Sequence, residues 1–144
     1  MKVKLMKVLL SIKPEYANKI LSGEKKFEFR KVSFTNTKVN TVVIYATKPV
    51  GKVVGEFEIL HIYSDSPSNI WERTKKFAGI EKKYFDSYYE GKDLAVAIAV
   101  GAVHEYEKPK NLSDIGAGVS APQSFCYIKP TDNELQRELE LKLG

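Results

Sequence analysis

The sequence is short of the residues that build disulfides and zinc sites. It contains one cysteine, Cys126, and two histidines, His61 and His104. An intrachain disulfide needs a second cysteine, and a structural zinc site usually takes about four Cys or His ligands at recognisable spacing. We therefore expect no disulfide, no metal and no cofactor. Cys126 is interpreted as a buried thiol, and both histidines as structural residues within strands.

Long hydrophobic runs are also missing. The apolar run near the N-terminus extends only from Val8 to Ile12 and is interrupted by Ser11. A signal-peptide core needs about 7–15 apolar residues, and a membrane-spanning helix about 20. The 144 residues suit one domain, without repeats or low-complexity segments. These observations predict a cytoplasmic protein with no membrane partner and leave its oligomeric state undetermined.

Basic residues, by contrast, are abundant and are concentrated near the N-terminus. The net charge is +5. Residues 1–31 carry nine Lys or Arg against three acidic residues, whereas the remainder carries fourteen basic and fifteen acidic residues. A localised basic region suits a polyanionic partner such as nucleic acid. An ordinary solvated charged face is the alternative.

The pattern of apolar residues, glycines and prolines predicts an α+β fold. Strands are expected at residues 5–12, 25–31, 41–47, 52–63, 94–107 and 124–128. Helices are expected at residues 14–22, 68–77, 81–90 and 131–143. Gly55 and Gly101 are candidate bulges, which would curve the long strands into a small β-barrel of about six strands with peripheral helices. We expect this barrel domain over residues 1–130, with residues 131–144 as a C-terminal helix packed on it or extending from it.

The segment from Gly23 to Arg30, GEKKFEFR, is the most informative part of the sequence. In an extended strand, Glu28 and Arg30 point to one side and the two phenylalanines point to the other. Arginine offers a planar fork for a phosphate or a base edge, and lysine offers a mobile point charge. Glu28 could orient either cation or accept hydrogen bonds from a base amino group. The alternative is a purely structural ion pair at the rim of the barrel.

This segment fits the pattern Gly-x-Lys-x-x-Glu-x-Arg and resembles the ASCH domain family of the PUA-like superfamily. Four further segments resemble that family in the same order: residues 11–17 (SIKPEYA), 44–49 (IYATKP), 53–57 (VVGEF) and 121–125 (APQSF). The resemblance covers residues 5–128. It implies a PUA-like β-barrel that binds RNA or a nucleotide, with the motif on the wall of a cleft between the barrel and the first helix.

Several residues are expected to form this cleft. The candidate ligand-binding residues are Lys13, Lys25, Glu28, Arg30, Thr47, Lys48, Ser120, Gln123 and Ser124. Lys25 is expected at the mouth of its strand. For Thr47 and Lys48 the alternative is simple turn chemistry before Pro49, and for the last three residues it is a flexible Gly-rich loop. Trp71, Tyr84, Tyr88 and Tyr89 could stack on bases, but their helical spacing favours the core.

The resemblance also leaves other functions open. Some ASCH proteins resemble amidohydrolases of acylated pyrimidine nucleosides, which use a lysine and a threonine in this motif. Lys25 matches that lysine, but Glu28 stands where the threonine nucleophile would be. Ribonuclease activity, with Glu28 as base and Lys25 or Arg30 steadying the phosphate, is a second alternative. A protein-interaction or coregulator-like domain is the third, suggested by the apolar residues Leu135, Leu139, Leu141 and Leu143.

Overall fold

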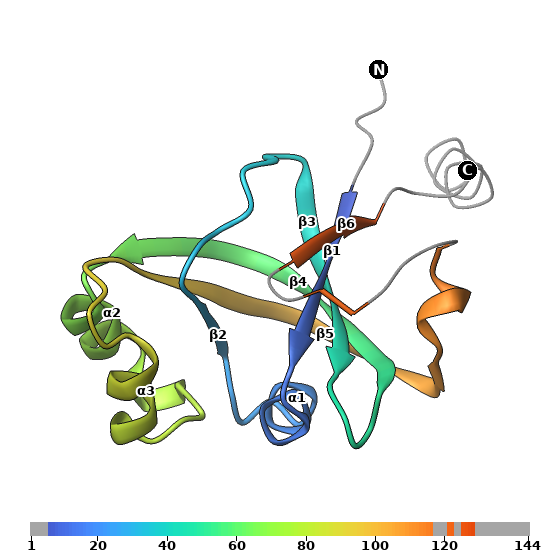
Figure 1. The fold of residues 1–144 in the computed structure, drawn as a ribbon, viewed down its shortest axis with the longest axis horizontal. Coiled ribbons are helices and arrows are strands. Elements are labelled where there is room, and N and C mark those ends of the chain that lie inside the picture. Colours follow the sequence, from blue (N-terminus) through green and yellow to red (C-terminus); the bar gives the residue numbers. More distant parts are fainter. Residues whose placement is uncertain (1–5, 117–120, 123–124, 129–144) are drawn as a thin grey trace.

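The computed structural model describes residues 6–116, 121–122 and 125–128 as an α+β fold (Figure 1). The strands are β1 (Met6–Ile12), β2 (Phe27–Arg30), β3 (Val39–Ala46), β4 (Lys52–Asp65), β5 (Ala95–Lys110) and β6 (Phe125–Ile128). The helices are α1 (Pro14–Leu21), α2 (Pro67–Thr74) and α3 (Lys82–Tyr88), with 3-10 turns η1 (Lys75–Phe77) and η2 (Leu112–Asp114). The predicted C-terminal helix lies outside the described residues. No helix in the described ranges is long and apolar enough to cross a membrane.

The strands form one mixed sheet in the order β2-β5-β4-β3-β1-β6. Among the described strands only β1 and β3 pair in parallel, and α1 and β2 lie in the connection between them. Figure 1 shows the long strands β4 and β5 sweeping across the sheet. The curved, barrel-like sheet of six strands confirms the predicted fold class. In the described part of the chain β2 and β6 form its two ends and are not paired with each other, so a seam stays open between them.

Both glycines that were predicted as bulges lie at irregularities between β4 and β5. The register shifts between Val53 and Gly55, and again between Phe57 and Ile59, opposite Gly101. A Cβ atom on Gly55 would lie only 2.7 Å from the carbonyl oxygen of His104. The missing side chain therefore allows the two strands to approach closely where they bend. Strand β5 continues to Lys110, past the predicted end at residue 107, because it still pairs with Val53 there.

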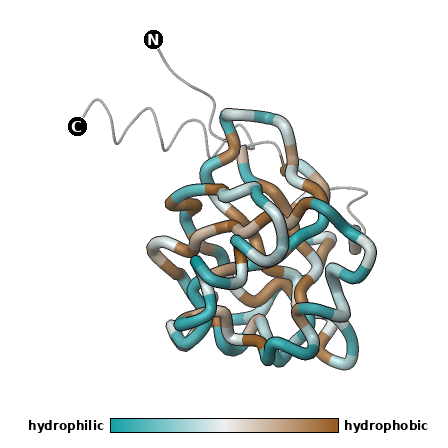
Figure 2. Tube along the Cα trace, turned by 90° about the vertical axis from the view of Figure 1, so that its left-hand side faces the viewer, coloured by the Kyte–Doolittle hydropathy of each residue, from teal (hydrophilic) through white to brown (hydrophobic). Residues whose placement is uncertain are grey.

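Two apolar cores lie on the two sides of β5. The first fills the curved sheet and includes Val8, Leu10, Ile20, Val42, Ile44, Phe57 and Ile98. The second joins the sheet to α2 and α3 and includes Phe29, Ile70, Phe85, Tyr89 and Ala97. The rings of Phe29 and Phe85 meet edge to face with centroids 5.1 Å apart. The tube in Figure 2 places apolar residues inside and polar residues around them.

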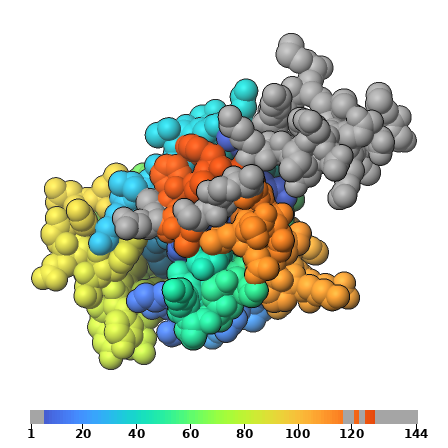
Figure 3. All heavy atoms as spheres, turned by 45° about the vertical axis from the view of Figure 1, so that its right-hand side comes forward, coloured from blue at the N-terminus to red at the C-terminus, as the bar shows by residue number. Residues whose placement is uncertain are grey.

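A third core lies at the other end of the molecule. Leu9, Val43, Tyr45 and Val53 are buried there beneath residues from β6 and from the segment around η2. Figure 3 shows these late segments, in orange and red, gathered beside the green β3–β4 turn. Cys126 belongs to this group but is only half-buried, which corrects the expected buried thiol. His61 and His104 lie exposed in β4 and β5, where their rings contact Tyr63 and Tyr106.

Candidate functional site

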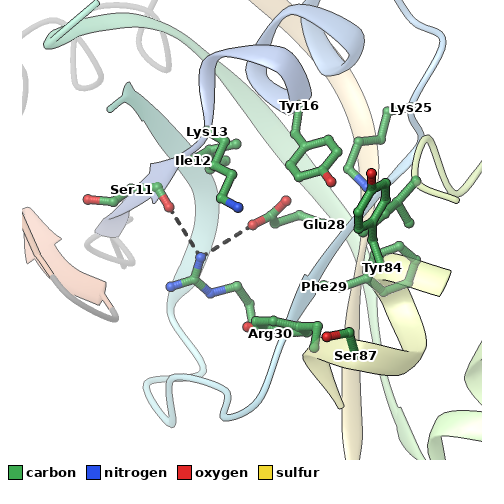
Figure 4. A pocket seen from close by; sticks show the side chains of 12 residues that line it. Ser11, Ile12, Lys13, Tyr16, Lys25, Glu28, Phe29, Arg30, Tyr84 and Ser87 are labelled. Atoms are coloured by element: carbon green, nitrogen blue, oxygen red, sulfur yellow. Dashed lines mark hydrogen bonds and ion pairs between the residues drawn. The ribbon is translucent and has the colours of Figure 1, made fainter. Parts of the chain in front are cut away.

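A pocket of about 370 Å³ lies where α1, β2 and α3 meet (Figure 4). It is lined by Ser11, Ile12, Lys13, Tyr16, Lys25, Glu28, Phe29, Arg30, Ile80, Tyr84, Ser87 and Tyr88. The end of β1 and the start of α1 form one wall, because Pro14 begins the helix directly after the strand. Strand β2 supplies the floor, and α3 supplies the opposite wall. The structure thus brings four predicted residues, Lys13, Lys25, Glu28 and Arg30, to one pocket.

Glu28 and Arg30 form an ion pair on one side of β2. The Arg30 Nη1 atom lies 3.3 Å from Glu28 Oε2 and donates to the backbone oxygen of Ser11, also at 3.3 Å. Burial raises the pKa of Glu28 above its ordinary 4.5, while the positive charges of Lys25 and Arg30 oppose that rise. The carboxylate is therefore held close to two cations in a place that water barely reaches.

Lys25 is one of the most deeply buried residues of the chain, with 2% of its surface exposed. Its Nζ atom donates to the backbone oxygen of Ala78 at 2.5 Å and lies 4.6 Å from the ring centroid of Phe29 and 5.2 Å from that of Tyr16. Burial lowers its pKa from 10.5 to about 8, a shift that Glu28 partly offsets. Lys25 was expected at the mouth of its strand; β2 starts at Phe27, and Lys25 lies buried two residues before it.

The burial of Lys25 has its cause in a segment more than fifty residues away. The backbone N–H of Lys26 donates to Phe77, and Lys19 Nζ donates to Gly79, so residues 77–79 are drawn over the Lys25 side chain. Gly79 has a φ of +65°, and a Cβ atom there would lie 2.5 Å from the Cβ of Lys25. Glycine is thus favoured at position 79 for two reasons. Its backbone is left-handed, and a Cβ atom would clash with the aliphatic part of Lys25.

Aromatic side chains line the pocket opposite the charges. Tyr84 and Tyr88 lie on α3 and are 52% and 37% exposed. Tyr89 is buried and donates to the backbone oxygen of Arg30 at 2.8 Å, and Trp71 packs on Phe85. The core interpretation therefore holds for Tyr89 and Trp71 and is wrong for Tyr84 and Tyr88. The buried pair Phe85 and Tyr89 has the same four-residue spacing as the exposed pair, so spacing alone could not separate them.

The other predicted site residues do not line this pocket or cannot be placed. Thr47 follows β3, and its N–H donates to the backbone oxygen of Ile12 at 3.0 Å, so it supports the pocket wall from behind. Lys48 is exposed and precedes a cis peptide bond to Pro49. Ser120, Gln123 and Ser124 lie outside the described residues. Within the described ranges, no group of three or more His, Cys, Asp or Glu side chains is arranged to hold a metal ion.

Comparison with known proteins gives one consistent family signal. The sequence model of the ASCH domain matches residues 10–104. A large ribosomal subunit protein uL22 of Ureaplasma parvum is 37% identical over 123 residues, which is 85% of this chain but 39% of that protein. The chain therefore spans well under half the length of that relative. An ASCH domain-containing ribonuclease of Zymomonas mobilis is 29% identical over 129 residues, which cover 88% of this chain and 86% of the ribonuclease.

A solved structure agrees with the sequence comparison. The crystal structure of ASCH from Zymomonas mobilis superposes with a TM-score of 0.79 at 28% sequence identity, and the match covers 94% of each chain. The likeness therefore extends over nearly the whole length of both proteins.

Proposed function

This chain belongs to the ASCH domain family, and we propose that it binds single-stranded RNA, with one nucleotide held in the pocket between α1, β2 and α3. One observation carries the proposal. Cations, a carboxylate and aromatic rings converge on a single pocket whose volume of about 370 Å³ falls in the range of small-molecule sites. These are the groups that recognise the phosphate, the base edge and the base face of a nucleotide.

Each part of the pocket matches one part of a nucleotide. Lys13 is exposed at the pocket rim, and Figure 4 shows its amino group directed toward Glu28 and Arg30. Lys13 and the Arg30 guanidinium suit a phosphate, because both are positive and Arg30 can donate more than one hydrogen bond. The Glu28 carboxylate suits the amino group of a base, and the ring of Tyr16, which also lines the pocket, suits its face.

The test is the salt dependence of RNA binding. Fluorescence anisotropy with a labelled short oligoribonucleotide should give an affinity that falls as salt rises, because phosphate contacts release counterions. Lys13→Gln should weaken binding and reduce the slope of log affinity against log salt by about one. Lys38→Gln removes another exposed lysine that does not line the pocket, so its slope should match the wild type. Absence of binding at low salt, or equal behaviour of the two variants, would refute the proposal.

A second candidate function is cleavage of the bound RNA, and the pKa values of two pocket residues favour it. The pKa of Lys25 is lowered to about 8, and that of Glu28 is raised from 4.5. A buried acid and a buried base whose pKa values move toward neutrality are suited to proton transfer near neutral pH. The relative from Zymomonas mobilis that is described as a ribonuclease supports the same candidate.

The reaction would proceed through the 2′-hydroxyl of the bound nucleotide. Glu28 accepts the 2′-hydroxyl proton while the 2′-oxygen forms a bond to the adjacent phosphorus. The bond from phosphorus to the 5′-oxygen of the next nucleotide breaks, and the Lys25 ammonium gives its proton to that oxygen. Arg30 stabilises the negative charge on the phosphate oxygens. The products are a 2′,3′-cyclic phosphate and a 5′-hydroxyl end.

Cleavage would show a bell-shaped dependence on pH. The rate should fall on the acid side as Glu28 becomes protonated and above about pH 8 as Lys25 loses its proton. Mass spectrometry of the products should detect cyclic phosphate ends. Glu28→Gln keeps the size of the side chain and removes the base, so cleavage that survives in this variant would exclude the mechanism while leaving the binding proposal untouched.

A further inference from the structure

Two exposed tyrosines on α3 each carry a lysine over the ring. Lys83 Nζ lies 5.0 Å from the ring centroid of Tyr84, and Lys31 Nζ lies 4.6 Å from that of Tyr88. The tyrosines are four residues apart, so they lie on the same face of the helix, one turn from each other. Both line the pocket. Two ring–lysine pairs therefore border the pocket, one with a lysine of α3 and one with the lysine that follows β2.

The packing of α3 explains these tyrosines only in part, because the ring of Tyr88 meets that of Tyr89 edge to face with centroids 4.8 Å apart. The helix is anchored by Phe85 and Tyr89, which are 1% and 3% exposed and belong to the second core. Tyr84 and Tyr88 leave much of their ring surface in solvent, next to the charged floor of the pocket. Large aromatic rings exposed beside a pocket indicate a surface that binds a ligand.

We propose that the pairs Tyr84–Lys83 and Tyr88–Lys31 are two further subsites for the nucleotides that flank the one in the pocket. The inference rests on the proposed RNA-binding function and extends it. A base stacks on each ring, and the flexible lysine moves from the ring to the neighbouring phosphate. The preferred ligand is then an extended stretch of single-stranded RNA, and a free nucleotide or nucleoside is a poorer one.

RNA is favoured over a protein partner by the continuity of this surface with the pocket. Both rings border the same pocket as Arg30 and Glu28, and each has a lysine beside it, so a strand that leaves the pocket over α3 has both a ring and a cation within reach. An acidic peptide would satisfy the lysines but would have no planar groups at regular intervals for both rings.

The test compares short RNAs that differ only in flanking bases. A labelled oligoribonucleotide with one central base is made in a second form in which the neighbouring bases are removed and every phosphate is kept. The wild-type protein should bind the complete RNA roughly tenfold more tightly for each base that stacks. Tyr84→Leu and Tyr88→Leu should each weaken binding of the complete RNA and reduce this preference, whereas Tyr84→Phe and Tyr88→Phe retain a ring and should keep it.

Phe77→Leu is the matched control. Phe77 is also exposed, at 48%, and also carries a lysine, with Lys26 Nζ 5.8 Å from its ring, but it does not line the pocket. Its replacement should leave both affinities unchanged. Equal binding of the two RNAs by the wild-type protein, or equal losses in Phe77→Leu and the tyrosine variants, would overturn the subsites while RNA binding in the pocket stands. A protein that binds neither RNA would overturn the proposed function itself.

Discussion

Lys25 and Lys26 are neighbours in the sequence, and the fold places them in opposite surroundings. Lys25 is 2% exposed, its ammonium lies against two aromatic rings and a backbone oxygen, and its pKa is lowered to about 8. Lys26 is exposed and lies 5.8 Å from the ring of Phe77. Successive side chains of an extended segment point to opposite sides, so one enters the protein and the other enters solvent.

The contrast between the two lysines shows which part of the basic N-terminal region can do chemistry. A lysine that is solvated keeps its proton at neutral pH and acts as a plain positive charge. A lysine in a poorly solvated place can release and regain a proton near neutral pH. In the proposed function, the abundance of basic residues would attract a polyanion, whereas cleavage would depend on the position of Lys25.

The largest expected effect is on RNA cleavage. Lys25→Met keeps an apolar chain of similar length and removes the proton donor, so the cleavage rate should fall by roughly 100-fold or more. Lys26→Met removes the same charge from the neighbouring residue and should leave the rate within about twofold, because general acid catalysis needs a positioned donor. Initial rates on a fluorogenic oligoribonucleotide measure both. Similar losses in the two variants would mean that net charge, and not position, controls the reaction.

The next effect concerns the stability of the fold at alkaline pH. Between about pH 8 and 10.5 the folded protein has lost the Lys25 proton while the unfolded chain retains it. The unfolded state then binds more protons, so the free energy of unfolding should rise across this window, by about 3 kcal/mol in total. Urea unfolding at several pH values measures the rise, which Lys26→Met should keep and Lys25→Met should lose.

Three tyrosines also change the stability of the protein at the upper end of this pH range. Burial raises the pKa of Tyr16, Tyr88 and Tyr89 above 10, which lowers stability as the unfolded chain ionises at higher pH. The quantity to compare is therefore the difference between the wild type and Lys25→Met at each pH. A difference that stays constant from pH 8 upward would show that Lys25 titrates normally in the folded protein.

A smaller effect tests how residues 77–79 hold Lys25. Gly79→Ala and Gly91→Ala both place an alanine at positive φ, +65° and +75°, but only the alanine at 79 would contact Lys25. Both variants should lose about 1 kcal/mol from the backbone, and Gly79→Ala should lose roughly 1–3 kcal/mol more from crowding. Only Gly79→Ala should also move the alkaline limb of the cleavage profile. Equal thermal unfolding and equal pH profiles would show that the lysine stem is not confined by this glycine.

The smallest expected effect is that of Lys26→Ala on stability. The substitution removes the contact between the exposed Lys26 ammonium and the exposed ring of Phe77. The free energy of unfolding should change by no more than about 0.5 kcal/mol. Urea unfolding at neutral pH provides the measurement, and a loss above about 1 kcal/mol would reveal a structural role for Lys26 that its exposure conceals.

The sequence predicted the strands and helices well because they follow local patterns. Pro14 and Gly23 marked the limits of α1, and the alternation in residues 25–31 marked β2. The two bulge glycines were found because a glycine within a long strand often marks a bulge or a close approach of two backbones. The end of β5 was predicted three residues too early; the strand includes Pro109, and a proline is tolerated near the end of a strand.

The candidate site was harder to predict because its walls come from distant parts of the chain. The motif identified Lys25, Glu28 and Arg30, but the cover over Lys25 is formed by Ala78 and Gly79. The tyrosines of α3 looked like core residues because the same helix does bury Phe85 and Tyr89. Such outcomes depend on how elements pack, which helical spacing alone does not contain.

Arg30 also connects two strands that do not pair in the described sheet. In the described sheet, strands β1 and β2 share no backbone pairing, and the Arg30 guanidinium bridges them by its hydrogen bond to the oxygen of Ser11. The guanidinium that is proposed to bind a phosphate therefore also connects two strands of the sheet. A group that contacts Arg30 in the pocket therefore contacts the side chain that also links β1 to β2.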